Sequence, residues 1–261
     1  MTTKGTVKVG TSGYSFADWQ TVFYPPRLPK AKMLDYYATQ FDTVEINATY
    51  YRIPPPPTFA SMVRRTKPHF EFMVKAHESL THKRHQAREL TPVFRDAIAP
   101  LAESGRLQGI LAQFPWSFVR NPQNLDHIKT CRELLIDYNL FVEFRHASWI
   151  RTEIFDLLRA LEIGFVSVDE PQLEQMVPPV AVATIPVGYV RFHGRNADKW
   201  YTGEGSDRYD YLYSESELQE WITKIEALRL EAKTVYLFFN NCHQGQAVTN
   251  ARQILEMLDV S

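Results

Sequence analysis

Eight short runs of β-branched and aromatic residues recur along the chain. They are residues 6–10, 43–46, 70–75, 108–114, 140–144, 164–168, 188–193 and 235–239. Stretches with helical periodicity lie between most of them, at 30–40, 59–66, 93–103, 125–136, 153–161, 215–228 and 246–258. Strands that alternate with helices of this length predict parallel β-α-β units. Eight such units in 261 residues predict an α/β fold of the closed (β/α)8 type, a TIM barrel, in preference to an open sheet.

One connection departs from the alternation. After Val168 the chain reads DEPQLEQMVPP, and its prolines are unfavourable inside a crossover helix. We therefore expect an irregular sixth βα unit, with a short turn followed by extended chain. No linker divides the sequence, so we expect a single TIM-barrel domain over residues 1–261.

The composition is that of an ordinary globular protein, with 44% hydrophobic and 23% charged residues. The formal net charge of -1 excludes a globally basic nucleic-acid binder but leaves room for a local basic patch. Two cysteines without paired spacing, Cys131 and Cys242, fit a reducing compartment. No secretory signal or membrane-spanning stretch is evident, so we expect a cytoplasmic protein with no membrane partner.

Polar residues gather where the predicted strands end. Four pairs lie two positions apart: Glu45 and Asn47, Lys75 and His77, Glu143 and Arg145, and Arg191 and His193. Comparable positions on other strands hold Gln113, Asp169, Asn240 and Asn241. Residues two apart in a strand share a face, and barrel active sites lie at the C-terminal strand ends. Charges inside a barrel are costly unless they are paired or serve a ligand, so this constellation predicts a ligand site.

A structural interpretation stands beside the functional one. Glu45, Lys75, Glu143 and Arg191 could neutralise one another as a buried network without a function. Taken singly, His193 resembles a structural histidine. The asparagines that follow the last strand could cap the final helix or close a turn.

Three loops enlarge the expected site. Residues 14–30 carry five aromatic side chains, and residues 194–214 combine Arg195, Lys199, Trp200 and Tyr201 with glycines. Aromatic and cationic side chains suit stacking on sugar or base rings and pairing with phosphate or carboxylate, although the aromatics could equally roof the barrel. The basic stretch 77–88 could contact a ligand or be an ordinary solvated charge run.

Standard catalytic motifs are absent. The chain has no P-loop, no GxGxxG after a strand, no GxSxG and no HExxH. The available histidines and carboxylates lack a diagnostic metal-ligand spacing, so we predict no metal ligands and no specific cofactor. Cys242 could be a nucleophile, but a small buried cysteine explains it equally well.

Seven segments in order resemble one known family over nearly the whole chain. They are VGTSGYSFADW, VEINATYYRIP, FMVKAHESLTH, LAQFPWSF, VEFRHASW, YVRFHGRN and FFNNCHQGQAVTNA. The set is similar to the YecE-like proteins, the bacterial family called domain of unknown function 72. This resemblance implies a TIM barrel.

The resemblance also points to candidate residues. Barrels of this family have been likened to endonuclease IV and xylose isomerase, which act on phosphodiesters and sugars through metals. This sequence lacks the histidine and carboxylate set of a three-zinc nuclease. The family motifs fall on Glu45, Asn47, Tyr51, Lys75, Gln113, Glu143, Arg145, Trp149, Arg191, His193, Asn240 and Asn241.

We therefore expect an enzyme that acts on a small anionic ligand, phosphorylated or sugar-like, by acid–base chemistry of the hydrolase, lyase or isomerase type. Glu143 or Glu45 would be the general base and His193 the proton shuttle. Lys75 would help hold the negative charge or, in a sharper variant, form a Schiff base.

The remaining candidates would bind the ligand. Arg191 and Arg145 would hold its negative charge, and the other expected ligand-binding residues are Asn47, Tyr51, Gln113, Trp149, Asn240 and Asn241. The alternative is a nucleic-acid-binding barrel distantly like endonuclease IV, without its full metal site. A binder of that kind requires a basic track that continues outside the pocket.

Overall fold

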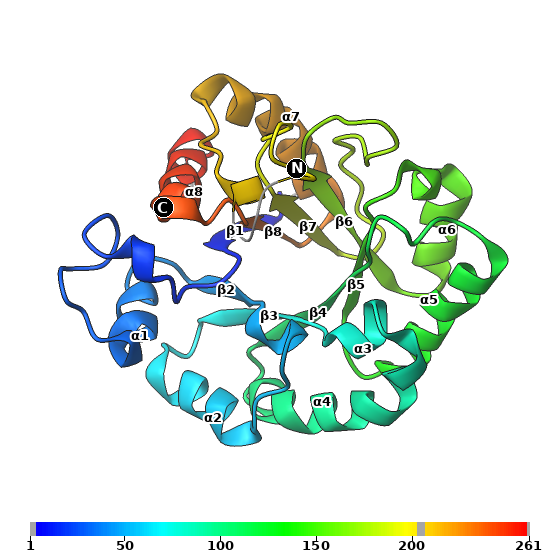
Figure 1. The fold of residues 1–261 in the computed structure, drawn as a ribbon, viewed down its shortest axis with the longest axis horizontal. Helices are drawn as coiled ribbons and strands as arrows, with labels where there is room; N and C mark the ends of the chain where they lie inside the picture. The colour runs from blue at the N-terminus through cyan, green and yellow to red at the C-terminus, as the bar shows by residue number, and fades with distance from the viewer. Residues whose placement is uncertain (1–3, 203–206, 260–261) are drawn as a thin grey trace.

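The computed structural model describes residues 4–202 and 207–259, and in these ranges eight parallel strands form a nearly closed barrel (Figure 1). The strands are β1 (Thr6–Thr11), β2 (Thr43–Ile46), β3 (Glu71–Lys75), β4 (Leu107–Gln113), β5 (Leu140–Glu143), β6 (Ile163–Asp169), β7 (Val187–Phe192) and β8 (Thr234–Phe239). Their order around the wall is β1-β8-β7-β6-β5-β4-β3-β2. Each strand coincides with one of the predicted runs, so the predicted TIM barrel is confirmed.

Helices surround the strands (Figure 1). They are α1 (Met33–Tyr37), α2 (Pro56–Arg65), α3 (Glu78–Thr81), α4 (Ala87–Glu103), α5 (Pro122–Leu134), α6 (Thr152–Ala160), α7 (Glu215–Glu231) and α8 (Gln246–Met257). Short 3-10 turns are η1 (Ala17–Trp19), η2 (Lys30–Lys32), η3 (Ala48–Tyr50), η4 (Arg84–Gln86), η5 (Ala147–Trp149), η6 (Asp207–Tyr209) and η7 (His243–Gly245). None of the helices in the described ranges is long and apolar enough to cross a membrane.

The connection from β6 to β7 has no helix in residues 170–186, all of which the structure describes. Extended chain replaces it, as predicted from the prolines at Pro171, Pro178 and Pro179. Thr184 fixes this segment to β6, because its hydroxyl accepts from the Phe165 backbone N–H at 2.8 Å.

The wall closes differently between β1 and β2 than elsewhere. In the described strands, these two meet at one bridge, between Ser12 and Glu45. Below it, the Tyr37 hydroxyl accepts from the Thr11 N–H at 2.9 Å and donates to the Thr43 carbonyl at 3.1 Å. Tyr37 belongs to α1, so a helix side chain supplies hydrogen bonds that a strand ladder supplies elsewhere. We call this joint, formed by Tyr37 between β1 and β2, the seam.

Candidate active site

A buried ion-pair network occupies the barrel interior near the C-terminal strand ends. Arg191 of β7 contacts both oxygens of Glu45 on β2, with Nε at 2.8 Å and Nη2 at 2.7 Å. Its Nη1 donates to Glu143 of β5 at 2.6 Å. The Tyr189 hydroxyl donates to Glu45 as well. All four side chains are buried, so Arg191 carries its charge between two carboxylates and away from solvent.

Arg145 forms the next layer toward the mouth. Its Nε donates to Glu143 at 2.6 Å and its Nη1 to Glu170 at 2.9 Å. His193 packs beside it, with Nε2 at 3.2 Å from Glu143. Asn240 places its amide nitrogen 3.0 Å from Nδ1 of His193. Because that amide donates, Nδ1 is the acceptor and the imidazole proton lies on Nε2, toward Glu143.

Glu143, the two arginines and His193 each keep one charge state near neutral pH. Burial opposes ionisation of Glu143, but Arg145 and Arg191 overcome it and hold its pKa well below the usual range. Burial and the charge of Arg145 lower the pKa of His193 to about 3, so the ring is neutral. Glu143 therefore holds both arginines in place, and neither it nor His193 changes its charge near neutral pH.

Lys75 sits beside this network at the end of β3. Its Nζ donates to Gln113 Oε1 at 2.8 Å and lies 4.5 Å from the centre of the Tyr50 ring. Gln113 is itself fixed, since its amide nitrogen donates to the Phe114 carbonyl at 2.7 Å. Burial and then the charge of Arg191 lower the pKa of Lys75 to about 7, against the opposing effect of the carboxylates.

Glu170 belongs to this cluster and was missed in the sequence, where Asp169 was singled out instead. Val168 pairs in register with Arg191, so it faces the interior, and the alternation then places Glu170 inward and Asp169 outward. Asp169 accepts from the Trp221 indole at 2.6 Å and is structural. Burial raises the pKa of Glu170 to about 8, although its contact with Arg145 opposes the shift.

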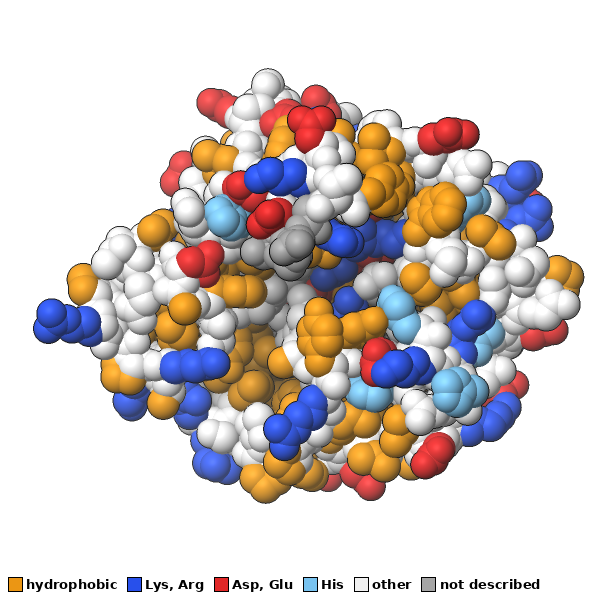
Figure 2. Space-filling model, in the orientation of Figure 1, with side chains coloured by type: hydrophobic (Ala, Val, Ile, Leu, Met, Phe, Trp, Pro, Cys, Tyr) orange, Lys and Arg blue, Asp and Glu red, His pale blue; other side chains and the backbone are white. Residues whose placement is uncertain are grey.

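A cavity of about 360 Å3 lies above Arg145 at the mouth of the barrel. Its lining residues are His82, Gln113, Pro115, Trp116, Arg145, Met176, Trp200, Tyr201, Arg208 and Tyr209. Figure 2 shows basic side chains gathered in the hollow of this face, with hydrophobic side chains around it. None of these lining residues carries a carboxylate. We call it the mouth cavity.

The structure brings eight of the twelve predicted residues into this cluster: Glu45, Lys75, Gln113, Glu143, Arg145, Arg191, His193 and Asn240. The position of Arg191 favours the structural alternative over the predicted ligand contact, which stays a prediction. Two buried carboxylates enclose its guanidinium beneath the mouth cavity, so it is their counter-ion.

The other four predicted ligand-binding residues do not line the mouth cavity. Tyr51 is 79% exposed. Trp149 is buried, stacks on Phe144 and donates to the Phe118 carbonyl. Asn241 donates to the backbone carbonyl of Tyr211 and to the side-chain oxygen of Asn250 and joins the last two helical units, which supports the structural alternative for it. Asn47 is half-buried, and its side-chain oxygen has no partner within the described ranges.

The three loops have different roles. In residues 14–30, Trp19 packs on Phe16 and Phe23 and donates to the Cys242 carbonyl at 2.7 Å, which favours the roofing interpretation. The loop 194–214 lines the mouth cavity through Trp200, Tyr201, Arg208 and Tyr209, while residues 203–206 lie outside the described ranges.

Most cations of the basic stretch 77–88 are engaged by neighbouring residues. Lys83 pairs with Glu78 at 2.5 Å, and Arg84 donates to Asn124 at 2.6 Å. His82 faces the mouth cavity. Burial raises the pKa of the Cys242 thiol, which disfavours the nucleophilic alternative because the thiolate is the reactive form.

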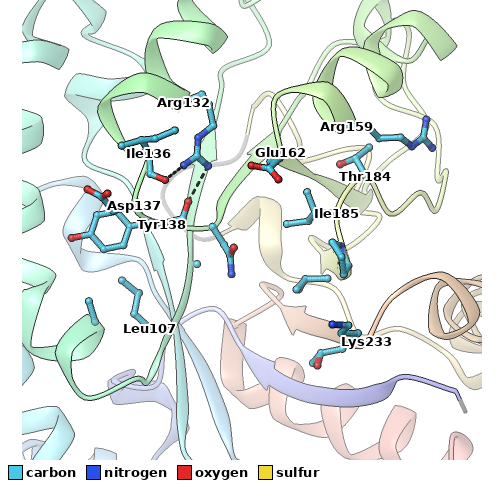
Figure 3. A pocket seen from close by; sticks show the side chains of 16 residues that line it. Leu107, Arg132, Ile136, Asp137, Tyr138, Arg159, Glu162, Thr184, Ile185 and Lys233 are labelled. Carbon is cyan, nitrogen blue, oxygen red and sulfur yellow. Dashed lines mark hydrogen bonds between the residues drawn. The ribbon is translucent and has the colours of Figure 1, made fainter.

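A larger hollow of about 800 Å3 lies at the opposite end of the barrel, where the strands begin (Figure 3). Arg132 points toward the end of its own helix there and donates to the carbonyls of Leu135, Ile136 and Tyr138. These bonds satisfy carbonyls that the end of α5 leaves free, which is a stabilising role. Among the described residues, no group of three or more His, Cys, Asp or Glu side chains is arranged to hold a metal ion.

Comparison with known proteins agrees with this fold. A family model described as "Protein of unknown function DUF72" matches residues 8–261. UPF0759 protein YunF of Bacillus subtilis is 31% identical over 271 residues, covering 97% of this chain and 95% of that protein. The solved structure of a DUF72 family protein from Thermotoga maritima has a TM-score of 0.91 and 44% identity, covering 97% and 99% of the two chains. One from Enterococcus faecalis has a TM-score of 0.89 and 28% identity, covering 98% and 96%.

Proposed function

Since the chain belongs to the DUF72 family, whose description assigns no activity, we propose its function from the site: it is an enzyme that acts by acid–base chemistry on a small anionic ligand. The lining of the mouth cavity carries the proposal. Among the described residues, the lining holds two arginines, Arg145 and Arg208, and no carboxylate. A phosphate or carboxylate of a phosphorylated or sugar-like compound would supply the missing negative charge.

The network beneath the cavity supports this role for Arg145. Glu143 and Glu170 hold its guanidinium by accepting from Nε and Nη1. An arginine oriented before binding loses little conformational entropy when an anion arrives. In a partly desolvated cavity, each charge-assisted contact is also stronger than in water.

Two groups have pKa values suited to proton transfer near neutral pH. Lys75 has a pKa of about 7 and hydrogen-bonds the lining residue Gln113, so it can exchange a proton with a ligand on the cavity floor. Glu170, with a pKa of about 8, gains or loses its own charge beside Arg145, whose charge is constant. In this proposal Lys75 and Glu170 replace Glu143 and Glu45 as the groups that transfer protons, because Glu143 and Glu45 are both paired with arginines.

The aromatic walls favour a ring-bearing or compact ligand. Trp116 and Tyr201 are exposed large hydrophobic side chains at the cavity. Trp200 also lines it, and the Arg145 guanidinium carbon lies 5.9 Å from the centre of the Trp200 ring. Such surfaces stack on sugar faces while the cations hold the phosphate.

We also propose that the protein resides in the cytoplasm. Cys131 and Cys242 are free thiols, and a reducing compartment keeps thiols in that state.

Ligand-dependent melting tests the proposal. Inorganic phosphate and glucose 6-phosphate should raise the melting temperature of the parent protein, because a ligand at 100 times its Kd adds about 2.7 kcal/mol of stability. The variant Arg208→Ala should lose most of the shift. Arg64→Ala, which removes an exposed arginine from α2, is the matched control and should keep it.

The same measurement separates the alternative. A parent protein that no anion stabilises at millimolar concentration would refute the small-ligand proposal. A shift produced by oligonucleotides alone, and lost steeply with added salt, would favour the nucleic-acid-binding barrel instead.

A further inference from the structure

We propose that Lys75 is a covalent nucleophile that forms a Schiff base with the carbonyl group of the bound ligand. This inference rests on the proposed function and names its substrate class. The ligand would be a small aldehyde or ketone that also bears a phosphate or carboxylate.

The first support is the absence of an ion pair at Lys75. A lysine in a barrel interior is ordinarily neutralised by a carboxylate. Within the described ranges, Lys75 pairs with none, and its hydrogen bond goes to the neutral oxygen of Gln113 at 2.8 Å. The nearby carboxylates are committed elsewhere, because Glu45 and Glu143 lie against Arg191. A lysine kept free of carboxylates keeps its lone pair available once it loses a proton.

The second support is access. Lys75 as a residue keeps part of its surface exposed, although burial of its amine is the main cause of the lowered pKa. Its hydrogen-bond partner Gln113 lines the mouth cavity, and so does His82. The Tyr50 ring covers Nζ at 4.5 Å and limits its movement. The amine therefore lies directly behind the cavity lining, one hydrogen bond from Gln113, and a ligand whose anionic end is held by Arg145 and Arg208 would approach it from there.

The third support is the electrostatic balance at the amine. Burial is the largest influence on the pKa of Lys75 and disfavours the ammonium form. Arg191 and Arg145 act in the same direction, whereas Glu143 and Glu45 oppose it. The resulting pKa of about 7 leaves roughly half of the lysine neutral at pH 7, whereas an ordinary lysine is neutral in about one molecule in 2500. His82 adds no competing charge, since burial and then Lys75 itself lower its pKa to about 4.

The covalent step balances without an external oxidant or reductant. The lone pair of the neutral amine attacks the carbonyl carbon, and the π electrons of the C=O bond move to oxygen. A proton passes from nitrogen to that oxygen and gives a carbinolamine. A second proton, taken from solvent through the open mouth, lets water leave as the nitrogen lone pair forms the C=N bond. The iminium keeps one proton on nitrogen and withdraws electrons from the adjacent carbon.

Reductive trapping tests the inference. The full chain is incubated at pH 7 with pyruvate or dihydroxyacetone phosphate and sodium cyanoborohydride, followed by intact mass measurement and peptide mapping. We expect one adduct on Lys75, at least about tenfold above any of the other lysines, because its pKa of about 7 leaves roughly half of its amine neutral at pH 7. Lactate and glycerol 3-phosphate lack the carbonyl, so they should give no adduct and should slow trapping by occupying the cavity.

Variants make the result specific. Lys75→Arg keeps the positive charge but removes the amine, so it should lose the adduct while still melting cooperatively. Arg208→Ala should slow trapping severalfold, and Arg64→Ala should not. Adducts spread over several lysines, or a Lys75 adduct that carbonyl-free anions do not slow, would overturn the inference. Absence of any adduct while phosphate still raises the melting temperature would reject the Schiff base and leave the proposed function standing; absence of both would reject both.

Discussion

Arg191 and Glu45 form a two-point ion pair inside the barrel, Nε and Nη2 of the arginine each lying within 2.8 Å of a separate carboxylate oxygen. The two residues stand on β7 and β2, with β8 and β1 between them in the wall. Their pair therefore links strands that share no ladder. Glu143 on β5 completes the link from the other side.

Removal of this arginine should destabilise the fold. Arg191→Met would leave Glu45 and Glu143 buried without their shared counter-ion, and breaking a buried pair in this way costs about 3–5 kcal/mol. Urea denaturation of the variant and the parent measures the difference. Arg64→Met, at an exposed position on α2, should stay within about 0.5 kcal/mol of the parent. Equal stability of Arg191→Met and the parent would contradict the structural role.

Anion affinity should fall as pH rises from 6 to 9. Lys75 loses its positive charge around pH 7 and Glu170 gains a negative one around pH 8, so both changes reduce attraction for an anion. His193 and His82, with pKa values of about 3 and 4, stay neutral throughout. Calorimetric titration with sulfate, whose own charge is constant in this range, measures the effect. An affinity that is flat or increases with pH would be inconsistent with these assignments.

Glu170 also predicts how stability varies with pH. Its pKa in the folded protein is about 8, above the ordinary value of 4.5. Between pH 4.5 and pH 8, therefore, Glu170 is protonated in the folded state and ionised in the unfolded state. The contribution of Glu170 to stability therefore falls as pH rises through this window. Glu170→Gln imitates the protonated form at every pH. Its melting temperature relative to the parent should increase from pH 5 to pH 8 and then level off, and a constant difference would refute the raised pKa.

Removal of the Tyr37 hydroxyl group tests the role of the seam. Tyr37→Phe leaves the Thr11 N–H and the Thr43 carbonyl without their shared partner, and a buried unsatisfied group costs about 1–3 kcal/mol. Tyr36→Phe on the same helix is the matched control, since Tyr36 is only half-buried. Hydrogen exchange should accelerate at Thr11 in Tyr37→Phe alone. Unchanged exchange there would show that strand pairing closes the barrel without the phenol.

The barrel could be predicted because its signals are local. Runs of β-branched residues and helical periodicity are visible within ten to fifteen positions, and prolines mark the one missing helix. Much of the cluster followed from the same logic, since alternation at strand ends placed Glu143 and Arg145, and Arg191 and His193, on one face.

Other parts of the site depend on information that the sequence does not carry. The choice between Asp169 and Glu170 required the register of β6 against β7. The burial of Arg191 depends on which carboxylates reach it from distant strands. Trp116 and Tyr209 reach the mouth cavity from loops, which have no periodicity from which a direction could be inferred.

Because of the seam, the barrel wall is a ring with one weak joint, between β1 and β2, and not a ring of continuous strand ladders. To widen a ring closed by eight ladders, a whole ladder must break, whereas at this gap only the Ser12–Glu45 bridge and the Tyr37 hydroxyl bonds must be released. Glu45 stands at the upper end of this gap, at the bridge to Ser12, and it is also the residue that holds Arg191. Widening of the gap would therefore pull on the ion pairs under the mouth cavity, and tightening of those ion pairs would draw the gap closed.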